Sequence, residues 1–309
     1  MSSDLFKFSI GKPKTETTVA SQPVPAAPAI PRGLAMSDDT FNNLRDLIYK
    51  ISGIYYTTSK KYLLEGRIAK RVTARGMNSF EEYIEFLKSP NNKDELKPLY
   101  DAITINETYF FRAEQQFEAF EKIIVPELME LKQGMPAPIF RIWSAASSTG
   151  EEAYTLAIII LERLKPKFPH VTFQILASDI NESVIEAART GIYKEYAVRN
   201  IPPAYLNKYF SKQVNTYVLS DQVKRMVKFM NVNLYDSNQM RMITSCDVIF
   251  CCNVLIYFDI PSKQKVVSYL YNSLNKGGYL FIGYSESLHG ISKAFKLVHL
   301  PKAMAYKKE

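Results

Sequence analysis

Cysteine is scarce in this chain of 309 residues: there are three, and two of them, Cys251 and Cys252, are adjacent. So few cysteines cannot form a disulfide framework, which fits a protein of a reducing cytoplasm. Adjacent cysteines are poor ligands for one zinc ion, and no CxxC motif or nearby histidine accompanies them, so we expect no metal site. The longest apolar run, from Ala153 to Leu161, falls well short of the roughly 18 residues of a membrane-spanning helix. Residues 1–35 also lack the apolar segment of a secretory signal, and we expect a cytoplasmic protein without membrane insertion.

The composition is that of a folded protein with a moderate positive charge. Hydrophobic residues make up 47% and charged residues 23% of the chain, which is ordinary globular usage. At about 100–200 residues per domain, the length indicates two domains. Lys and Arg outnumber Asp and Glu by 39 to 31, a net charge of +8. This charge fits a nucleic acid partner, an acidic protein partner or simple solubility, and does not choose among them.

Composition and periodicity divide the chain into segments. Residues 1–35, rich in proline and alanine, predict a flexible tail. Residues 36–112 predict a helical domain, because apolar residues recur there at helical spacing between capping residues and glycines. A linker with one long helix follows at 113–137. In residues 138–309 strands alternate with helices, which predicts a doubly wound parallel sheet; within it, a small antiparallel β-subdomain is expected at about 190–230.

The segment Ala145–Gly150 joins the first expected strand, at 140–144, to a helix that begins at Glu151. Its small side chains would let the backbone approach a ligand at the carboxyl end of the sheet. The G-x-G-x-x-G fingerprint of dinucleotide sites is absent, and two acids at the helix start disfavour a pyrophosphate. Taken alone, the turn fits a helix capped by Ser148 or Thr149 as well as it fits a cofactor site.

Asp179 follows the second expected strand, at 171–177. An acid there can accept hydrogen bonds from both hydroxyls of a ribose, although Asp179 or Asn181 could instead cap the next helix, at 182–190. The turn and the acid together favour a cofactor that contains adenosine without phosphates. S-adenosylmethionine, with its sulfonium cation and amino-acid tail, fits this description.

Six segments in order resemble the CheR-type chemotaxis receptor methyltransferases, a family of protein-glutamate O-methyltransferases. They are NETYFFR (106–112), RIWSAASSTGEEAY (141–154), ASDI (177–180), VNLY (232–235), CDVIFCCNVLIYFD (246–259) and GGYLFIGYSES (277–287). The resemblance covers about residues 36–305. It implies a Rossmann-like S-adenosylmethionine-dependent methyltransferase sheet, an N-terminal all-helical domain and a small antiparallel β-subdomain insertion. The implied reaction is methyl transfer to glutamate carboxylates of chemoreceptors, which yields glutamyl methyl esters and S-adenosylhomocysteine in chemotaxis adaptation.

The resemblance also implies site residues, position by position. Arg112 and Tyr257 match residues placed beside the transferred methyl group and are the expected catalytic pair. Where this chain has Cys252, family members often have arginine, so we expect a backbone contact at that position. The full set of expected cofactor-binding residues is Asn106, Thr108, Arg112, Glu152, Asp179, Asn233, Leu234, Cys252 and Asn253.

A basic face is expected on the second helix, opposite its apolar stripe. Residues 58–76 hold six cations and one glutamate, a net charge of +5. Such a face is commonly only solvated, and nucleic acid is a rival partner, although no base-reading motif accompanies the charges. The resemblance favours docking of the cytoplasmic helices of methyl-accepting chemotaxis receptors, where charge would speed association. The expected docking residues are Lys60, Arg67, Lys70, Arg71 and Arg75.

In some family members the β-subdomain binds a receptor C-terminal pentapeptide through a loop that contains glycine. Residues 211–228 contain no glycine, so we expect no such tether. We separately expect the protein to be a monomer. Two other functions stay open: a methyltransferase-like scaffold module without turnover, and a methyltransferase for RNA or a small molecule. The presence of Arg112, Asp179, Asn253 and Tyr257 argues against the scaffold, and the match of six motifs argues against the other acceptors.

Overall fold

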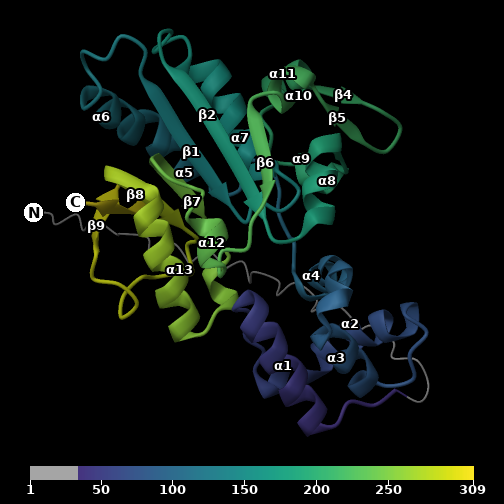
Figure 1. Cartoon of the computed structure of the whole chain (residues 1–309). Helices are drawn as coiled ribbons and strands as arrows, with labels where there is room; N and C mark the ends of the chain where they lie inside the picture. Colours follow the sequence, from purple (N-terminus) through teal and green to yellow (C-terminus); the bar gives the residue numbers. More distant parts are fainter. Residues whose placement is uncertain (1–33) are drawn as a thin grey trace, which may run out of the picture.

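A computed structural model describes residues 34–309 (Figure 1). It contains a helical domain, a seven-stranded sheet flanked by helices, and a separate three-stranded antiparallel sheet. The predicted fold class is therefore confirmed. The predicted flexible tail, residues 1–35, lies almost wholly outside the described residues. None of the helices between residues 34 and 309 combines the length and apolar character needed to cross a membrane.

The helical domain is organised by local capping signals and a buried apolar stripe. The Ser37 side chain accepts a hydrogen bond from the backbone of the first turn of α1, and Ser79 does the same for α3. Gly53 ends α1 with a φ of 73°, a left-handed conformation that glycine adopts at little cost. The core includes Phe41, Leu44, Ile48, Leu64, Ile68 and Val72. The helices are α1 (Asp38–Ser52), η1 (Thr58–Lys60), α2 (Lys61–Ala74), α3 (Phe80–Lys88), η2 (Pro90–Glu95) and α4 (Leu96–Ile103).

The large sheet has the strand order β6-β2-β1-β7-β8-β10-β9. The first five strands in this order are parallel, as predicted, whereas β10 runs antiparallel to both β8 and β9. The sheet is therefore mixed, because the alternation of strands and helices stops after β8 and a hairpin closes the edge. The strands are β1 (Ile139–Ala145), β2 (Thr172–Asp179), β6 (Val227–Asn231), β7 (Cys246–Cys251), β8 (Leu274–Ile282), β9 (Phe295–Leu300) and β10 (Ala303–Lys308).

The antiparallel insertion is smaller than predicted. Residues 227–231, expected to belong to it, form β6 and pair in parallel with β2 at the edge of the large sheet. The three-stranded sheet has the order β3-β5-β4, with β3 (Ile192–Tyr193), β4 (Phe210–Lys212) and β5 (Tyr217–Leu219). Three short helices accompany it: α9 (Glu195–Val198), α10 (Pro203–Tyr209) and α11 (Asp221–Lys224).

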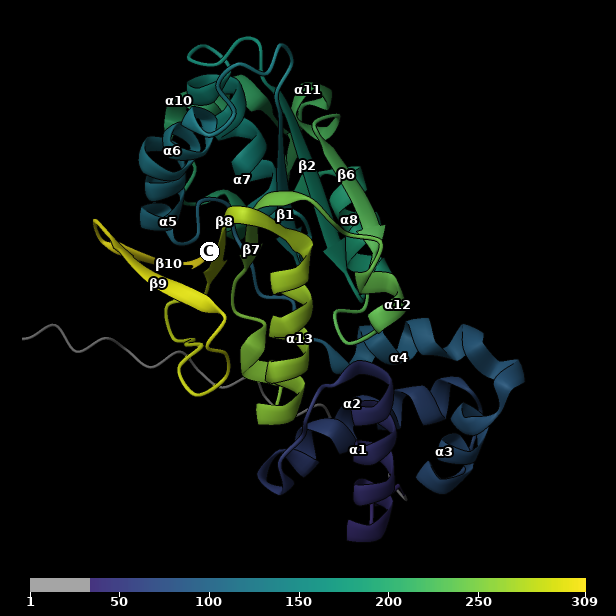
Figure 2. The same cartoon turned by 60° about the vertical axis from the view of Figure 1, so that its left-hand side comes forward.

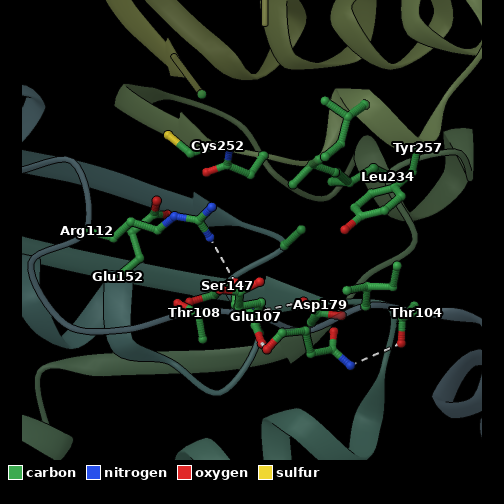
Figure 3. Close-up of a pocket in the computed structure, with 18 of the residues that line it drawn as sticks. Thr104, Glu107, Thr108, Arg112, Ser147, Glu152, Asp179, Leu234, Cys252 and Tyr257 are labelled. Carbon is green, nitrogen blue, oxygen red and sulfur yellow. Dashed lines mark hydrogen bonds between the residues drawn. The ribbon is translucent and has the colours of Figure 1, made fainter. Parts of the chain in front are cut away.

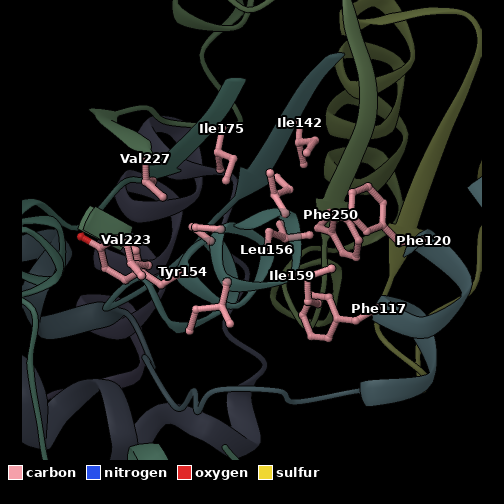
Figure 4. Close-up of a cluster of buried hydrophobic side chains, with 14 of the residues drawn as sticks. Phe117, Phe120, Ile142, Tyr154, Leu156, Ile159, Ile175, Val223, Val227 and Phe250 are labelled. Carbon is pink, nitrogen blue, oxygen red and sulfur yellow. The ribbon is translucent and has the colours of Figure 1, made fainter. Parts of the chain in front are cut away.

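Helices cover both faces of the large sheet (Figures 1 and 2). Successive residues of a strand point to opposite faces, so Ile142 and Phe250 enter one apolar cluster (Figure 4) while Trp143 and Ile249 enter the other. Burying a large apolar side chain contributes about 1.5–3 kcal/mol. The helices are α5 (Glu114–Ala119), η3 (Phe120–Ile124), α6 (Val125–Glu130), α7 (Glu151–Ile159), η4 (Ile160–Leu164), α8 (Glu182–Thr190), α12 (Ser237–Met240), η5 (Leu255–Tyr257) and α13 (Ile260–Ser273), of which η3 and η4 are π-helical.

The helical domain lies beyond the carboxyl ends of the parallel strands (Figure 2). Hydrogen bonds join the two parts: the Asn233 amide donates to the Ile51 carbonyl at 2.7 Å, and the Asn181 amide donates to the Thr104 hydroxyl at 2.9 Å. The Tyr55 backbone N–H also donates to the carbonyl of Tyr257 at 2.9 Å. These bonds fix the helical domain against the strand ends where a ligand of such a sheet binds.

Candidate active site

A cavity of about 560 Å³ lies at the carboxyl ends of β1, β2 and β7, beneath the helical domain. Every residue expected from sequence to bind cofactor or to act in catalysis lines it, and Figure 3 labels most of them. Ser52, Ile54 and Ile103 of the helical domain complete its wall. The cavity residues predicted from sequence are Asn106, Thr108, Arg112, Glu152, Asp179, Asn233, Leu234, Cys252, Asn253 and Tyr257.

The turn after β1 presents backbone to the cavity. Ala146 and Ser148 have φ values of 58° and 51°, and Gly150 has 91°, so the chain folds tightly before α7. Neither Ser148 nor Thr149 caps α7, because the residue at its N-cap is Gly150 and no side chain bonds there. Instead, the Ser148 N–H donates to Asp179 Oδ2 at 2.9 Å. Of the two interpretations of this turn, helix cap or ligand contact, the side-chain arrangement favours the ligand.

Asp179 is held with its carboxylate at the cavity wall and is only 5% exposed. One oxygen accepts from the Ser148 N–H and the other from the Asn181 N–H, both at 2.9 Å. Burial raises the pKa of Asp179, and these backbone bonds act in the opposite direction. Asp179 does not cap α8, since the Asn181 side chain accepts from Val184 N–H at 3.1 Å. Each Asp179 oxygen keeps a lone pair for a ligand hydroxyl.

Glu152 places a half-buried carboxyl group in the cavity without a direct cationic partner among residues 34–309. It accepts a hydrogen bond from the Ser144 hydroxyl at 2.7 Å. Burial raises its pKa to about 7, while the bond from Ser144 and the positive charge of Arg112 act against that rise. Its neighbour Glu151 turns away from the cavity and accepts from the Thr149 hydroxyl at 2.7 Å. A carboxylate largely withdrawn from water in this way is stabilised by a positively charged ligand.

Arg112 and Tyr257 approach the cavity from opposite sides (Figure 3). Arg112 comes from the loop before α5; its Nη1 donates to the Glu107 carbonyl at 2.9 Å, and its Cζ lies 5.7 Å from the Tyr109 ring centroid. Tyr257 ends η5. Burial raises the pKa of Tyr257 above its usual value, so the phenol stays protonated at neutral pH and can donate a hydrogen bond.

Glu286, which sequence analysis did not single out, shapes the loop that carries Asn253. Its carboxylate accepts from the backbone N–H groups of Asn253 at 2.9 Å, Ile256 at 3.2 Å and Gly283 at 2.6 Å. Asn253 has a φ of 62°, and these bonds hold that left-handed conformation. The GYSES segment includes Glu286, but only the fold shows that its carboxylate reaches the loop after β7.

The remaining walls are less polar than their residue types suggest. Both polar atoms of the Asn233 amide are engaged, one with the Ile51 carbonyl at 2.7 Å and the other with the Tyr235 N–H at 3.0 Å. Leu234 is buried and offers an apolar surface. Burial raises the pKa of the Cys252 thiol well above its usual value, so this thiol is a protonated, weakly polar wall.

The predicted docking residues lie on η1, on α2 and, for Arg75, directly after α2, outside the cavity. The guanidinium groups of Arg71 and Arg75 both pair with the carboxylate of Glu95, which is fully buried, and Arg67 donates to the Ile103 carbonyl at 3.0 Å. Lys60 and Lys70 are exposed and outside these pairs. The structure therefore divides the expected basic face into arginines that bind within the domain and lysines that face solvent.

Comparison with known proteins gives matches along nearly all of the described chain. Residues 39–104 match the all-alpha domain of CheR methyltransferases, and residues 106–304 match their S-adenosylmethionine-binding domain. Chemotaxis protein methyltransferase 2 of Vibrio cholerae is 36% identical over 276 residues, 89% of this chain and 94% of the relative. The chemotaxis protein methyltransferase of Borreliella burgdorferi is 35% identical over 256 residues, 82% and 90% respectively.

Among solved structures, magnesium protoporphyrin IX methyltransferase from Synechocystis with bound S-adenosylmethionine aligns with a TM-score of 0.33 and 13% identity, over 73% of this chain and 94% of that chain. The family matches do not depend on this likeness. They extend over both the helical domain and the large sheet, and the cavity residues expected from the family motifs are brought together in one place. This chain belongs to the CheR methyltransferase family and is an S-adenosylmethionine-dependent methyltransferase.

Proposed function

We propose that this enzyme transfers the methyl group of S-adenosylmethionine to glutamate side-chain carboxylates of chemoreceptors. The products are glutamyl methyl esters and S-adenosylhomocysteine. The observation that carries this proposal is the convergence of Arg112, Glu152, Asp179 and Tyr257 on one cavity in a chain whose relatives are named chemotaxis protein methyltransferases. No observation favours a scaffold module without turnover.

The cavity residues suit the parts of this cofactor. The two Asp179 oxygens would accept from the ribose hydroxyls, and Asn233 and Leu234 would flank the adenine. Glu152 would lie near the cationic sulfonium and amino groups, where its charge is complementary. Asn106, Thr108, Cys252 and Asn253 would complete the pocket, the last two through the backbone. The bound cofactor supplies an electrophilic methyl carbon.

The reaction asks little acid–base chemistry of the protein. A glutamate with a pKa of about 4.3 is already ionised at neutral pH and needs no general base. Its oxygen forms a bond to the methyl carbon as the carbon–sulfur bond breaks, and the electron pair stays on sulfur, so no proton moves. Catalysis is then alignment and removal of water. Arg112 would hold the incoming carboxylate with its planar fork, and Tyr257 would donate a hydrogen bond beside the methyl path.

Radiolabelled S-adenosylmethionine and membranes that contain chemoreceptors test the reaction directly. We expect label in receptor protein that alkali releases as methanol, because carboxyl esters are labile to base. Arg112→Ala is expected to remove most of the transfer, whereas Arg45→Ala, which removes a partly exposed arginine of α1 outside the cavity, serves as the matched control. Absent label, or label that resists alkali, contradicts the assignment to glutamate.

We further propose that acidic receptor helices dock on the face of α2 that carries Lys60, Arg67, Lys70, Arg71 and Arg75. Glu95 and Asp94 pair with the arginines at its distal end, and Asp38 pairs with Lys61. These three acids reduce the local excess from +5 to +2. The exposed Lys60 and Lys70 should therefore contribute most of the attraction. Lys60→Glu with Lys70→Glu is expected to raise the KM for receptor about tenfold at low salt with little change in kcat. Lys88→Glu on α3 is the matched control, and an equal effect of this control would contradict the docking site.

The enzyme is also proposed to act as a cytoplasmic monomer without a receptor peptide tether. The proposed acceptors are helices of the cytoplasmic region of chemoreceptors, so the enzyme would have to be in the cytoplasm to reach them. The loop between β4 and β5 spans residues 213–216 and contains no glycine, which supports the absence of a pentapeptide site like that of some relatives. Fluorescence anisotropy should show no binding of a receptor C-terminal pentapeptide at micromolar concentrations, and saturable binding would overturn this point. Light scattering should give a monomer mass.

A further inference from the structure

The loop that carries Arg112 has a backbone conformation that other contacts must maintain. Phe111 and Ala113, on either side of Arg112, have φ values of 57° and 63°. Residues other than glycine adopt this left-handed region only at a cost in free energy, and such strain persists where the surroundings fix it. The position of Arg112 therefore depends on what holds residues 106–113.

The inner half of this loop is fixed by buried contacts. Phe110 is fully buried and packs edge-on against Tyr193 and Phe210, with ring centroids 4.8 and 5.2 Å away. Its backbone N–H donates to the Ala197 carbonyl at 3.0 Å. These contacts anchor the aromatic side of the loop, but they do not reach the Arg112 guanidinium.

The guanidinium of Arg112 contacts two other residues of the same loop. Its Nη1 donates to the Glu107 carbonyl at 2.9 Å, and its Cζ lies 5.7 Å from the Tyr109 ring centroid. Both of these residues are held from outside the loop. The Tyr196 hydroxyl donates to Glu107 Oε1 at 2.9 Å, and Arg199 Cζ lies 3.6 Å from the ring centroid of Tyr109.

Tyr196 and Arg199 also hold each other. Arg199 Cζ lies 3.6 Å from the Tyr196 ring centroid, and Arg199 donates a hydrogen bond to the Tyr196 carbonyl. Tyr196 belongs to α9, and Arg199 is the first residue after that helix; both lie in the segment between β3 and β4. The two side chains thus form a clasp, exposed on the outside, over the residues that Arg112 contacts.

We propose that Tyr196 and Arg199 are positioning residues for Arg112 in methyl transfer. They act through Glu107 and Tyr109, so the segment inserted around the three-stranded sheet takes part in building the active site even without a peptide partner. The proposal rests on the catalytic role of Arg112 proposed above. Contacts of a cation with aromatic rings are individually weak at exposed sites. The clasp therefore affects the conformation of the loop at residues 106–113 and contributes little to the stability of the protein.

Steady-state kinetics with receptor-containing membranes test this role. Arg199→Ala is expected to lower kcat about fivefold, with the KM for receptor within twofold of wild type and a melting temperature within about 2 °C. Arg199→Lys keeps a cation over the rings and should recover more than half of the lost rate. Lys212→Ala is the matched control, because it removes a cation 5.5 Å from the Tyr217 ring in the adjoining three-stranded sheet without contact with the loop.

Hydrogen–deuterium exchange of the enzyme alone gives a readout that does not depend on activity. Arg199→Ala and Tyr196→Phe should each increase exchange in peptides that cover residues 106–113, with strands β1 and β2 unchanged. An unchanged kcat, unchanged exchange at 106–113, or an equal effect of Lys212→Ala would overturn the proposal. If wild type fails to methylate receptors, the proposed function fails, whereas the exchange experiment still decides whether the clasp orders the loop.

Discussion

The affinity of this enzyme for its cofactor should depend on pH through Glu152. Burial raises the pKa of Glu152 to about 7, from an ordinary value of 4.5. A ligand with positively charged groups favours the carboxylate, so binding must release the proton wherever Glu152 carries one. Affinity is therefore full above pH 7 and is lost as the pH falls through 7. Arg112, Glu286 and Cys252 are the other ionisable groups that act on Glu152.

The size of this effect follows from the pKa. With a value of about 7, roughly ten molecules in eleven carry the proton at pH 6, half carry it at pH 7 and one in eleven at pH 8. Removing the proton costs about 1.4 kcal/mol for each pH unit below the pKa. Binding should therefore weaken about fivefold to tenfold between pH 8 and pH 6, and binding at pH 7 should release about half a proton.

Isothermal titration calorimetry with S-adenosylmethionine at pH 6, 7 and 8 measures both quantities, provided that each pH is tested in two buffers of different ionisation enthalpy. Glu152→Gln should bind more weakly and lose the pH dependence that comes from Glu152. Any pH dependence that remains in this variant measures titration of the ligand itself. Glu151→Gln is the matched control: burial raises the pKa of that carboxyl to about 7 as well, but it points to Thr149. Equal affinity of wild type at pH 6 and pH 8, or an unaltered slope in Glu152→Gln, would refute the reasoning.

Asp179→Ala should weaken S-adenosylmethionine binding at least a hundredfold in calorimetry, since it removes two hydrogen bonds from ligand hydroxyls to a charged group, each of which contributes about 1.5–3 kcal/mol; an affinity within threefold of wild type would remove Asp179 from the site. Glu95→Ala should lower the free energy of unfolding by about 3 kcal/mol in urea titrations, because it leaves two arginines without their buried partner. Gly53→Ala should lower the melting temperature by several degrees, because a Cβ there would lie 2.5 Å from an aromatic ring. Gly76→Ala, with φ of 67° and open space around it, should show only the smaller backbone cost.

Helices can be predicted from the sequence when their ends are set by capping residues next to them in the chain. The helix expected at 182–190 is found as α8 with the same bounds, because its start and end depend on adjacent side chains. Asn181 accepts from the Val184 N–H, and Gly191 takes a φ of 68° at the other end. The cavity residues were expected from motifs that this chain shares with the CheR family, and those residues lie near the carboxyl ends of strands or in the loop before α5.

Features that depend on distant partners were not predictable in this way. Residues 227–231 alternate weakly, and only pairing with β2 makes them a parallel strand of the large sheet. Helical spacing places Arg71 and Arg75 on one face of α2 but says nothing of Glu95, which binds both from another segment. Glu286 reaches the Asn253 loop across the ends of two strands, a proximity that spacing along the chain does not encode.

Asn233 lines the cavity and, with the same side chain, ties the two domains together. Its amide donates to the Ile51 carbonyl at the end of α1. The residue proposed to flank the adenine therefore also holds the helical domain against the large sheet. A variant at Asn233 that is scored by turnover alone would merge two separate defects, one in ligand capture and one in domain alignment. Pairing calorimetry with a distance probe between α1 and α12 would assign each defect to its cause.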